Sequence, residues 1–330
     1  MTGGRLVFSL AIASVIGILA ACLLGSTPMS LAQVWSAASP CPQSAADQII
    51  IWQIRLPRAL AAFVVGAALG VSGAALQGLL RNPLAEPGVL GVSASAALGA
   101  TLVIYYGLAG LMPWVVPIAA IIGALVATAV IALAALQTRS VVTLILVGVG
   151  LSSFAGALMS LLMNFAPNPF SLSDMINWML GSVANRSFDD LAIAAPFMLA
   201  GLGLLFVTRR GLSALTLGEE AASGIGLDLS RQRIFVVLGA GLATGAAVSI
   251  AGAIGFVGIV APHIVRPFVG HDPARSLLPS GLLGGLLLVV ADIVVRLLPT
   301  AFELKLGVVA ALIGAPAFVW IAMQRRAEHG

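Results

Sequence analysis

Apolar stretches of about 20 residues alternate with short polar segments along almost the whole chain. A run of this length is long enough to cross the hydrocarbon core of a bilayer as a helix. The pattern therefore predicts an all-α, polytopic membrane protein with about ten transmembrane helices in a single domain of residues 1–330. The expected spans are residues 6–25, 59–80, 88–107, 113–136, 141–165, 190–208, 234–252, 254–269, 278–298 and 304–323.

The longest polar interval, Arg209–Arg233, separates two strongly apolar halves and has two arginines at each end. Thr216 and Glu219 have the spacing of a capping box, which predicts a short helix there. That helix is expected to end near Gly224, and a second short helix is expected to start at residues 228–230. By itself the interval also suits a solvated connector between spans.

The N-terminus resembles a secretory signal, with Arg5 before an apolar run and small residues at positions 30–32. The run Leu6–Leu24 is nevertheless long enough to span a bilayer. We interpret it as a retained first span.

Arginine placement predicts the orientation, because positive residues near span ends are retained in the cytoplasm. With both termini inside, eleven arginines fall on the cytoplasmic side and five basic residues outside. The inner set is Arg5, Arg81, Arg139, Arg209, Arg210, Arg231, Arg233, Arg266, Arg275, Arg325 and Arg326, and the outer set is Arg55, Arg58, Arg186, Arg296 and Lys305.

Composition strengthens this class and excludes others. Hydrophobic residues make up 60% of the chain and charged residues 8%, which no soluble domain of this size tolerates. The net charge of +4 comes from arginines at span ends and does not indicate nucleic-acid binding. Cys22 and Cys41 are too few for a disulfide framework, and His263 and His271 are too far apart to indicate a metal site. No cofactor or metal is expected.

Small residues form several faces at helical spacing. Such faces let transmembrane helices approach closely. They occur at Gly66, Gly70 and Gly73, at Gly241 and Gly245, and at Gly281 and Gly285.

The segment Arg81–Gly88 contains two prolines and forbids a continuous helix. Irregular backbone at membrane depth is tolerated only against protein or a water-filled cavity. The segment therefore predicts either a gate-like constriction or a tight inner loop.

The segments around two further residues leave alternatives open. Trp178, in the amphipathic stretch 171–182, suits either an interfacial anchor or the lining of an outer vestibule.

The second span is expected to open at Arg55 with Pro57 near its start, after a solvent-exposed loop at residues 27–53. Asp292 and Arg296 are four residues apart, which suits an intrahelical ion pair, and the position of Arg296 toward the outer end equally allows it to face outward.

Several kinds of chemistry are missing from the sequence. Lys305 is the only lysine and follows no glycine-rich turn, so the chain has no P-loop for nucleotide hydrolysis. Catalytic triads and paired-cysteine motifs are also absent from the sequence. The chain is therefore expected not to be an enzyme, and uphill transport needs an ion gradient or another subunit. The acidic residues cluster at span ends, which weighs against ion coupling.

Six ordered motifs resemble the FecCD/BtuC-type permeases, the membrane subunits of bacterial ATP-binding-cassette (ABC) importers for iron chelates, haem and cobalamin. The resemblance covers Arg55 to Arg326. Its motifs are RLPRALAAFVVGAALGVSGAALQGLLRNPLAEPGVLGVSASAALGA, WMLGSVANRSFDD, LGEEAASGIGL, AGAIGFVGIVAPHIVRPFVGHDPAR, LLVVADIVVR and GVVAALIGAPAFVW.

The resemblance implies roles for particular residues. Contacts to the cytosolic ATPase are implied for Leu217, Gly218, Glu219, Glu220, Ala221, Gly224 and Gly226. Docking of a periplasmic or lipid-anchored substrate-binding protein is implied for Arg55, Arg58 and Arg296, as charge-assisted pairs with carboxylates. A cytoplasmic gate is implied for Asn82, Leu84, Val141 and Val142. The two valines stand where the cobalamin relative has a hydroxylated pair, and Lys305 replaces a usual proline.

The implied function is therefore that of an importer permease, working as a homodimer in the inner membrane of a bacterium. An iron chelate, as siderophore or haem, is the first expectation for the cargo, and cobalamin is the alternative. A proton- or sodium-coupled carrier remains a further alternative, in which neutralising Asp292 abolishes uptake. A passive channel is the last.

Overall fold

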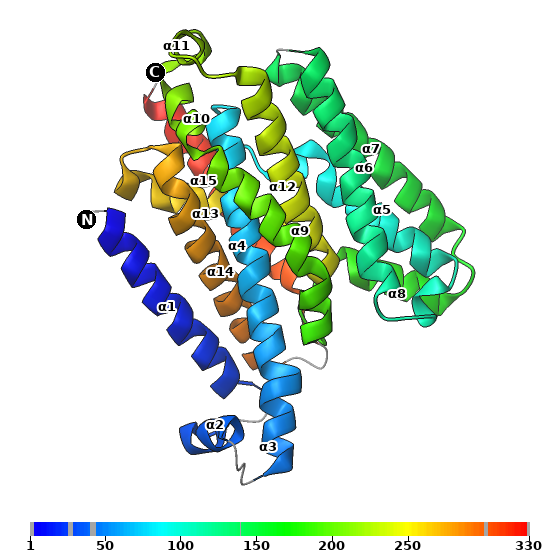
Figure 1. Ribbon diagram of the computed structural model, residues 1–330. Coiled ribbons are helices and arrows are strands. Elements are labelled where there is room, and N and C mark those ends of the chain that lie inside the picture. Colours follow the sequence, from blue (N-terminus) through cyan, green and yellow to red (C-terminus); the bar gives the residue numbers. More distant parts are fainter. Residues whose placement is uncertain (1–2, 26–28, 40–43, 139, 300–302, 329–330) are drawn as a thin grey trace.

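In the described part of the computed structural model, helices account for all regular secondary structure (Figure 1). The described residues are 3–25, 29–39, 44–138, 140–299 and 303–328, and the side chains of residues 38, 141, 317, 318 and 320–328 lie outside that description. Within these residues no strand occurs. The expectation of an all-α membrane protein is confirmed.

Seven stretches of helix in the described residues are long and apolar enough to cross a membrane. They are α1 (Gly3–Leu23), the continuous segment Ala45–Leu79, α6 (Val115–Gln137), α7 (Val141–Asn164), α9 (Phe188–Val207), α12 (Leu229–Ala251) and α14 (Pro273–Leu297). Three shorter apolar segments lie in α5 (Val92–Tyr105), in α13 (Val257–Val265) with η5 (Arg266–Val269), and in α15 (Leu306–Glu328). The expected number of about ten is met only when these shorter segments are counted.

The segment before the second span differs from the expected exposed loop. It forms α2 (Leu31–Ala38), α3 (Ala45–Ile49) and a π-helical turn, η1 (Ile50–Arg55), which runs directly into α4 (Leu56–Leu79). A π turn shifts hydrogen bonding by one residue. Pro57 lies in the first turn of α4, as the sequence predicts, but the helical segment extends back through the π turn to Ala45.

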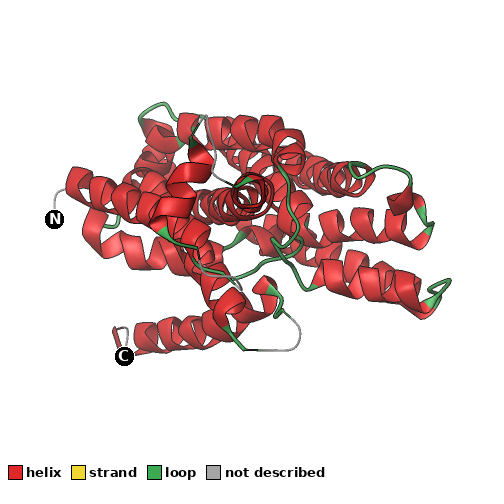
Figure 2. Ribbon diagram, turned by 90° about the horizontal axis from the view of Figure 1, so that it is seen from below, coloured by secondary structure: helices red, strands yellow, loops and turns green. Residues whose placement is uncertain are grey.

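The bundle is built around α4 and α12, most of whose side chains are buried. Helix α4 packs against α14, α12 and α13, and α12 also packs against α9 and α6. Helices α5, α6 and α7 form a second group, joined by α8 (Pro169–Met179) (Figures 1 and 2). A bundle of this kind has two ends, which we name the α11 end and the α2 end after the helices that lie there in Figure 1.

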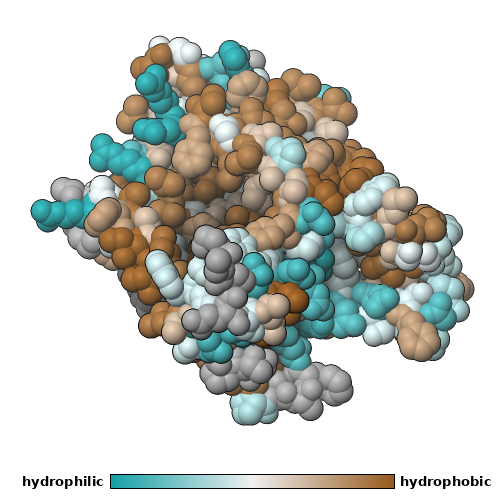
Figure 3. All heavy atoms as spheres, turned by 60° about the horizontal axis from the view of Figure 1, so that its bottom comes forward, coloured by the Kyte–Doolittle hydropathy of each residue, from teal (hydrophilic) through white to brown (hydrophobic). Residues whose placement is uncertain are grey.

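Glycines set the closest helix contacts, as the sequence predicts. Gly66 on α4 lies against the backbone of Gly284 and Gly285 on α14, and Gly73 lies against Gly258 on α13. A side chain at either glycine would overlap that backbone. Apolar side chains cover much of the face seen in Figure 3, while hydrophilic atoms gather in separate patches.

Candidate functional site

The polar middle of the chain folds into two short helices at the α11 end, α10 (Arg209–Ala214) and α11 (Glu219–Gly224), joined by the turn η4 (Leu215–Leu217). The prediction that Thr216 caps the helix is wrong, because its hydroxyl group donates to the Ser213 carbonyl at 2.6 Å. The residue directly before α11 is Gly218, with φ 100°. The predicted second short helix is instead the start of the long α12. Asp228 caps it by accepting the Arg231 N–H at 3.0 Å.

The residues predicted to contact the ATPase do not all point outward. Both oxygens of Glu219 accept hydrogen bonds from Nη2 of Arg233, at 2.7 and 2.8 Å, and Arg233 on α12 is only 3% exposed. Glu220, Ala221, Gly224 and Gly226 are exposed. Leu217, at 67% exposed, lies just before α11. Glu219 therefore joins α11 to a long helix, whereas its neighbours are free for a partner.

Glycine is required at the end of α11. Gly226 has φ 91°, a left-handed conformation that residues with a Cβ rarely adopt. Its N–H bonds the Ser223 carbonyl (2.9 Å), and the Leu227 N–H bonds the Ala222 carbonyl (3.0 Å). This Schellman arrangement ends the helix and turns the chain into α12.

A buried charge cluster lies at the α2 end. Arg58 on α4 donates from Nε and Nη2 to both oxygens of Asp292 on α14, at 2.7–3.1 Å. The same guanidinium group pairs with Glu303, which lies three residues before α15. Nε of Arg296 also lies 3.1 Å from Asp292, so the intrahelical pair is present. Asp292 is only 1% exposed, and its carboxylate pairs with two arginines, Arg58 and Arg296.

Two arginines hold the end of α1. The last carbonyls of a helix have no partner within it and lie at the negative end of its dipole. Nη1 of Arg55 donates to the carbonyls of Cys22 and Leu23, both at 2.8 Å. Nη1 of Arg296 donates to the carbonyls of Ala21 and Leu24, both at 3.1 Å.

The cluster brings together all three arginines predicted to dock a binding protein. Arg55 is 4% exposed, Arg58 is 9% exposed, and the side chain of Arg296 is 9% exposed. Each has partners inside the chain. Docking stays a prediction, and it requires a partner's carboxylates to reach groups that are largely covered in this structure.

The predicted gate residues lie on two neighbouring elements. Asn82 is exposed, and its Oδ1 accepts the Leu84 N–H at 3.0 Å. Val142, in the first turn of α7, is 65% exposed. The side chain of Val141 and residue Arg139 lie outside the described part of the chain. The loop continues into the 3-10 turn η2 (Pro87–Leu90), which packs on α7. Their gating role stays a prediction.

The same loop reaches the break between α12 and α13. Gly252 and Phe256 have φ of 71° and 68°, so the chain is not helical between the two helices. Oε2 of Glu86 accepts the Phe256 N–H at 3.1 Å. Burial raises the pKa of the Glu86 carboxyl group, and this hydrogen bond opposes the rise. A half-buried carboxyl group thus holds the start of α13.

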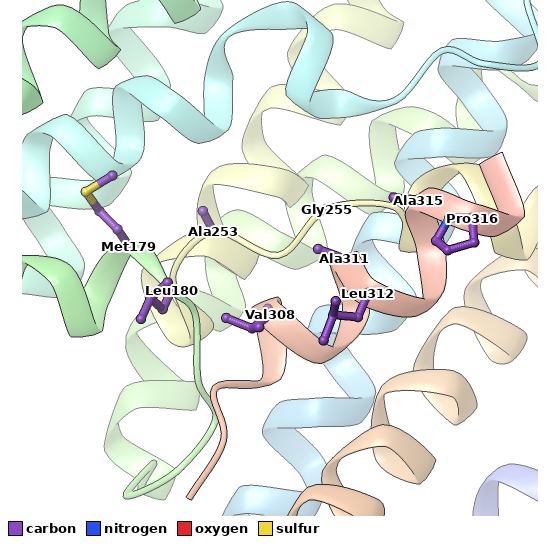
Figure 4. Close-up of a pocket in the computed structure, with 10 residues that line it drawn as sticks. Met179, Leu180, Ala253, Gly255, Val308, Ala311, Leu312, Ala315 and Pro316 are labelled. Carbon is purple, nitrogen blue, oxygen red and sulfur yellow. The ribbon is translucent and has the colours of Figure 1, made fainter. Parts of the chain in front are cut away.

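An apolar cavity of about 590 Å³ opens beside this break. Figure 4 shows its lining, which comes from the end of α8, the residues between α12 and α13, and one face of α15. Its side chains are aliphatic or thioether. They belong to Met179, Leu180, Ala253, Val308, Ala311, Leu312, Ala315 and Pro316, and Gly255 and Gly307 contribute backbone. None of the described side chains that line it is charged, so it offers a surface without a strong binding site for a polar cargo.

Trp178 faces a different hollow, of about 370 Å³, which it shares with Asp174, Arg186 and Lys305. The Nε of Arg186 is buried without a hydrogen-bond partner, and burial lowers the pKa of this guanidinium group. Trp178 was expected either to anchor the chain at the membrane interface or to line an outer vestibule. Its position beside this hollow agrees with the second role.

Comparison with known proteins decides the family. The FecCD transport family matches residues 12–324. The chain belongs to the FecCD transport family. FecCD proteins are permease subunits of ABC importers, so this chain is a multi-pass permease that works with an ATPase and a substrate-binding protein.

Several named proteins are similar to this chain over most of its length. The uncharacterised ABC transporter permease protein YvrB of Bacillus subtilis (strain 168) is 40% identical over 84% of this chain and 79% of its own length. The vitamin B12 import system permease protein BtuC of Klebsiella pneumoniae is 40% identical over 86% of this chain and 85% of its own. A solved structure of an ABC transporter assigned to the metal-chelate type, in an inward-facing conformation, is 30% identical with a TM-score of 0.87. It covers 97% of this chain and 99% of that one.

The sequence did not predict two features of this structure, the apolar cavity and the pair between Glu303 and Arg58. The cavity joins residues 179–180, 253–255 and 307–316, which no periodicity links. Glu303 pairs with Arg58 across 245 positions. The charged residues Glu303 and Lys305 interrupt two apolar runs in the sequence, and this interruption was the one sign that a charged contact forms there.

Proposed function

We propose that the chain is one half of a homodimeric importer permease, folded as a single transmembrane domain, through which a metal-chelate cargo crosses the inner membrane. The apolar cavity of about 590 Å³ carries this proposal. It lies between α15 and the α12–α13 break (Figure 4). In this proposal a second copy faces it and completes the wall of a pathway. Apolar walls without charges suit passage rather than retention.

The energy comes from outside the chain. We assign the exposed residues around α11 to the contact with the cytosolic ATPase, which places the α11 end and both termini in the cytoplasm. Leu217 and Ile225 are 67% and 68% exposed at the two ends of α11 and suit an apolar partner surface. Glu219, through Arg233, transmits the movement of α11 to α12.

The α2 end faces the binding protein in this proposal. Arg55, Arg58 and Arg296 lie close together there, and Arg58 and Arg296 pair with carboxylates of this chain. Guanidinium groups form charge-assisted bonds with carboxylates, so they suit an acidic partner surface. The segment with Asn82 and Leu84, and the start of α7 with Val142, form the gate at the cytoplasmic side.

Cobalamin is the better supported cargo. BtuC proteins named as vitamin B12 permeases are 40% identical to this chain, whereas the similarity that names the metal-chelate type is 30%. This favours the alternative over an iron chelate. An iron chelate stays the second candidate because the family as a whole does not separate the two.

The experiment is reconstitution with the ATPase of the same transporter. Leu217→Ser with Ile225→Ser is expected to abolish co-purification of the ATPase and ATP-driven uptake, whereas Thr216→Ala, exposed in the same segment, leaves both intact. Uptake of cyanocobalamin and of a ferric siderophore is then compared. Undiminished ATPase binding by the double variant contradicts the assignment of α11.

A further inference from the structure

We propose that Glu303 holds, inside this chain, the place of a carboxylate on the binding protein. Docking then exchanges one carboxylate for the other at Arg58 and releases the segment that leads into α15. The inference rests on the proposed function, in which an acidic binding protein docks at the α2 end. The inference adds to that function a residue, Glu303, that competes with the binding protein for Arg58. It also connects the docking surface to the apolar cavity.

The two carboxylates on Arg58 differ in accessibility. The Asp292 side chain is 2% exposed and is also held by Arg296. The Glu303 side chain is 41% exposed, while the side chain of Arg58 beneath it is 11% exposed. Only Glu303 can leave without breaking the core of the cluster, and its departure uncovers the guanidinium group.

The cluster also lacks an acceptor. Asp292 is shared between Arg58 and Arg296, and Glu303 pairs only with Arg58. Nη2 of Arg296 is buried without a hydrogen-bond partner. A buried donor without a partner is unfavourable, and a carboxylate from outside supplies a charged acceptor for it. The occupant that fits is an acidic side chain on a docked protein.

Glu303 is connected to the cavity by a short segment of chain. The carbonyl of Lys305 accepts the N–H groups of Val308 and Val309 at 3.1 and 3.2 Å, which starts α15. The Gly307 N–H donates to the Gly181 carbonyl at 3.2 Å. Val308 lines the apolar cavity. A shift of Glu303 therefore acts on the first turn of α15 and on the wall that the cargo meets.

Glu303→Gln tests the exchange, with Asp189→Asn as the matched control. Asp189 is an exposed carboxylate in the first turn of α9, at the same end of the molecule. Both variants remove one negative charge and strengthen docking of an acidic protein through long-range attraction. Glu303→Gln alone weakens a charge-assisted bond that docking must break, so we expect about tenfold tighter docking for it and less than about twofold for the control.

Docking is measured with the purified binding protein of the same transporter, against the assembled permease and ATPase in lipid nanodiscs. A spin label at Leu304→Cys, in a Cys41→Ser background, reports the mobility of the segment before α15. Mobility is expected to rise on docking in the parent and to be high without docking in Glu303→Gln.

Equal affinities for Glu303→Gln and Asp189→Asn, or a label that docking leaves unchanged, overturn the exchange while the proposed function stands. If the parent transporter fails to bind its binding protein, the docking assignment itself is wrong, and this inference is lost with it.

Discussion

The contact between α4 and α14 sets the position of the charge cluster, because Arg58 lies on α4 and both Asp292 and Arg296 lie on α14. Gly66→Ala tests how tightly the two helices must approach. The added methyl group would lie 2.6 Å from the carbonyl carbon of Gly284 and 2.9 Å from the Cα of Gly285. These atoms are backbone, so no side chain can rotate to make room, and the helices must separate.

Overpacking of this kind costs typically about 1–3 kcal/mol. We expect a value near the upper end, about 3 kcal/mol, since only backbone can move. Gly203→Ala on α9 is the control. It has no atom within 4 Å of the added methyl group, and replacing glycine in a helix is favourable by up to about 1 kcal/mol.

Unfolding of both variants is measured by SDS titration in mixed micelles, with tryptophan fluorescence as the signal. Gly66→Ala should unfold at a clearly lower SDS fraction than the parent, and Gly203→Ala at the same or a higher one. Equal midpoints for the two variants would refute the close approach of α4 and α14.

Three further predictions follow from the charged residues and the cavity. Asp292→Asn leaves two buried arginines short of one carboxylate and should cost about 3–5 kcal/mol of stability, measured in the same titration; an unchanged midpoint contradicts the cluster. Glu219→Gln should lower ATP-driven uptake several-fold while ATPase binding persists, because its contact is internal; lost binding instead would mean that Glu219 touches the ATPase. Val308→Trp should fill part of the cavity and reduce uptake without loss of assembly; normal uptake would exclude the cavity from the pathway.

Much of the architecture was predictable because a bilayer restricts the choices. Runs such as Leu6–Leu24 must be helical where they cross lipid, since every backbone group needs a partner within the helix. Small residues at regular spacing marked the faces of α4 and α14 for the same physical reason. The Asp292–Arg296 pair followed from a spacing of four within one helix.

The remainder depended on tertiary contacts. The sequence did not reveal that Glu219 turns inward to Arg233, because both sides of α11 carry acidic residues. The π turn before Pro57 extends a helix through a residue that usually marks a start. The docking arginines were predicted to pair with carboxylates of a partner, whereas in the structure Glu303 from a distant segment covers Arg58.

Vesicle accumulation of labelled cyanocobalamin tests the central claim most directly. Purified permease is reconstituted with its binding protein, with and without the ATPase and ATP. The account predicts accumulation above the outside concentration only when both ATPase and ATP are present. Accumulation by the permease alone under an imposed proton or sodium gradient would contradict it.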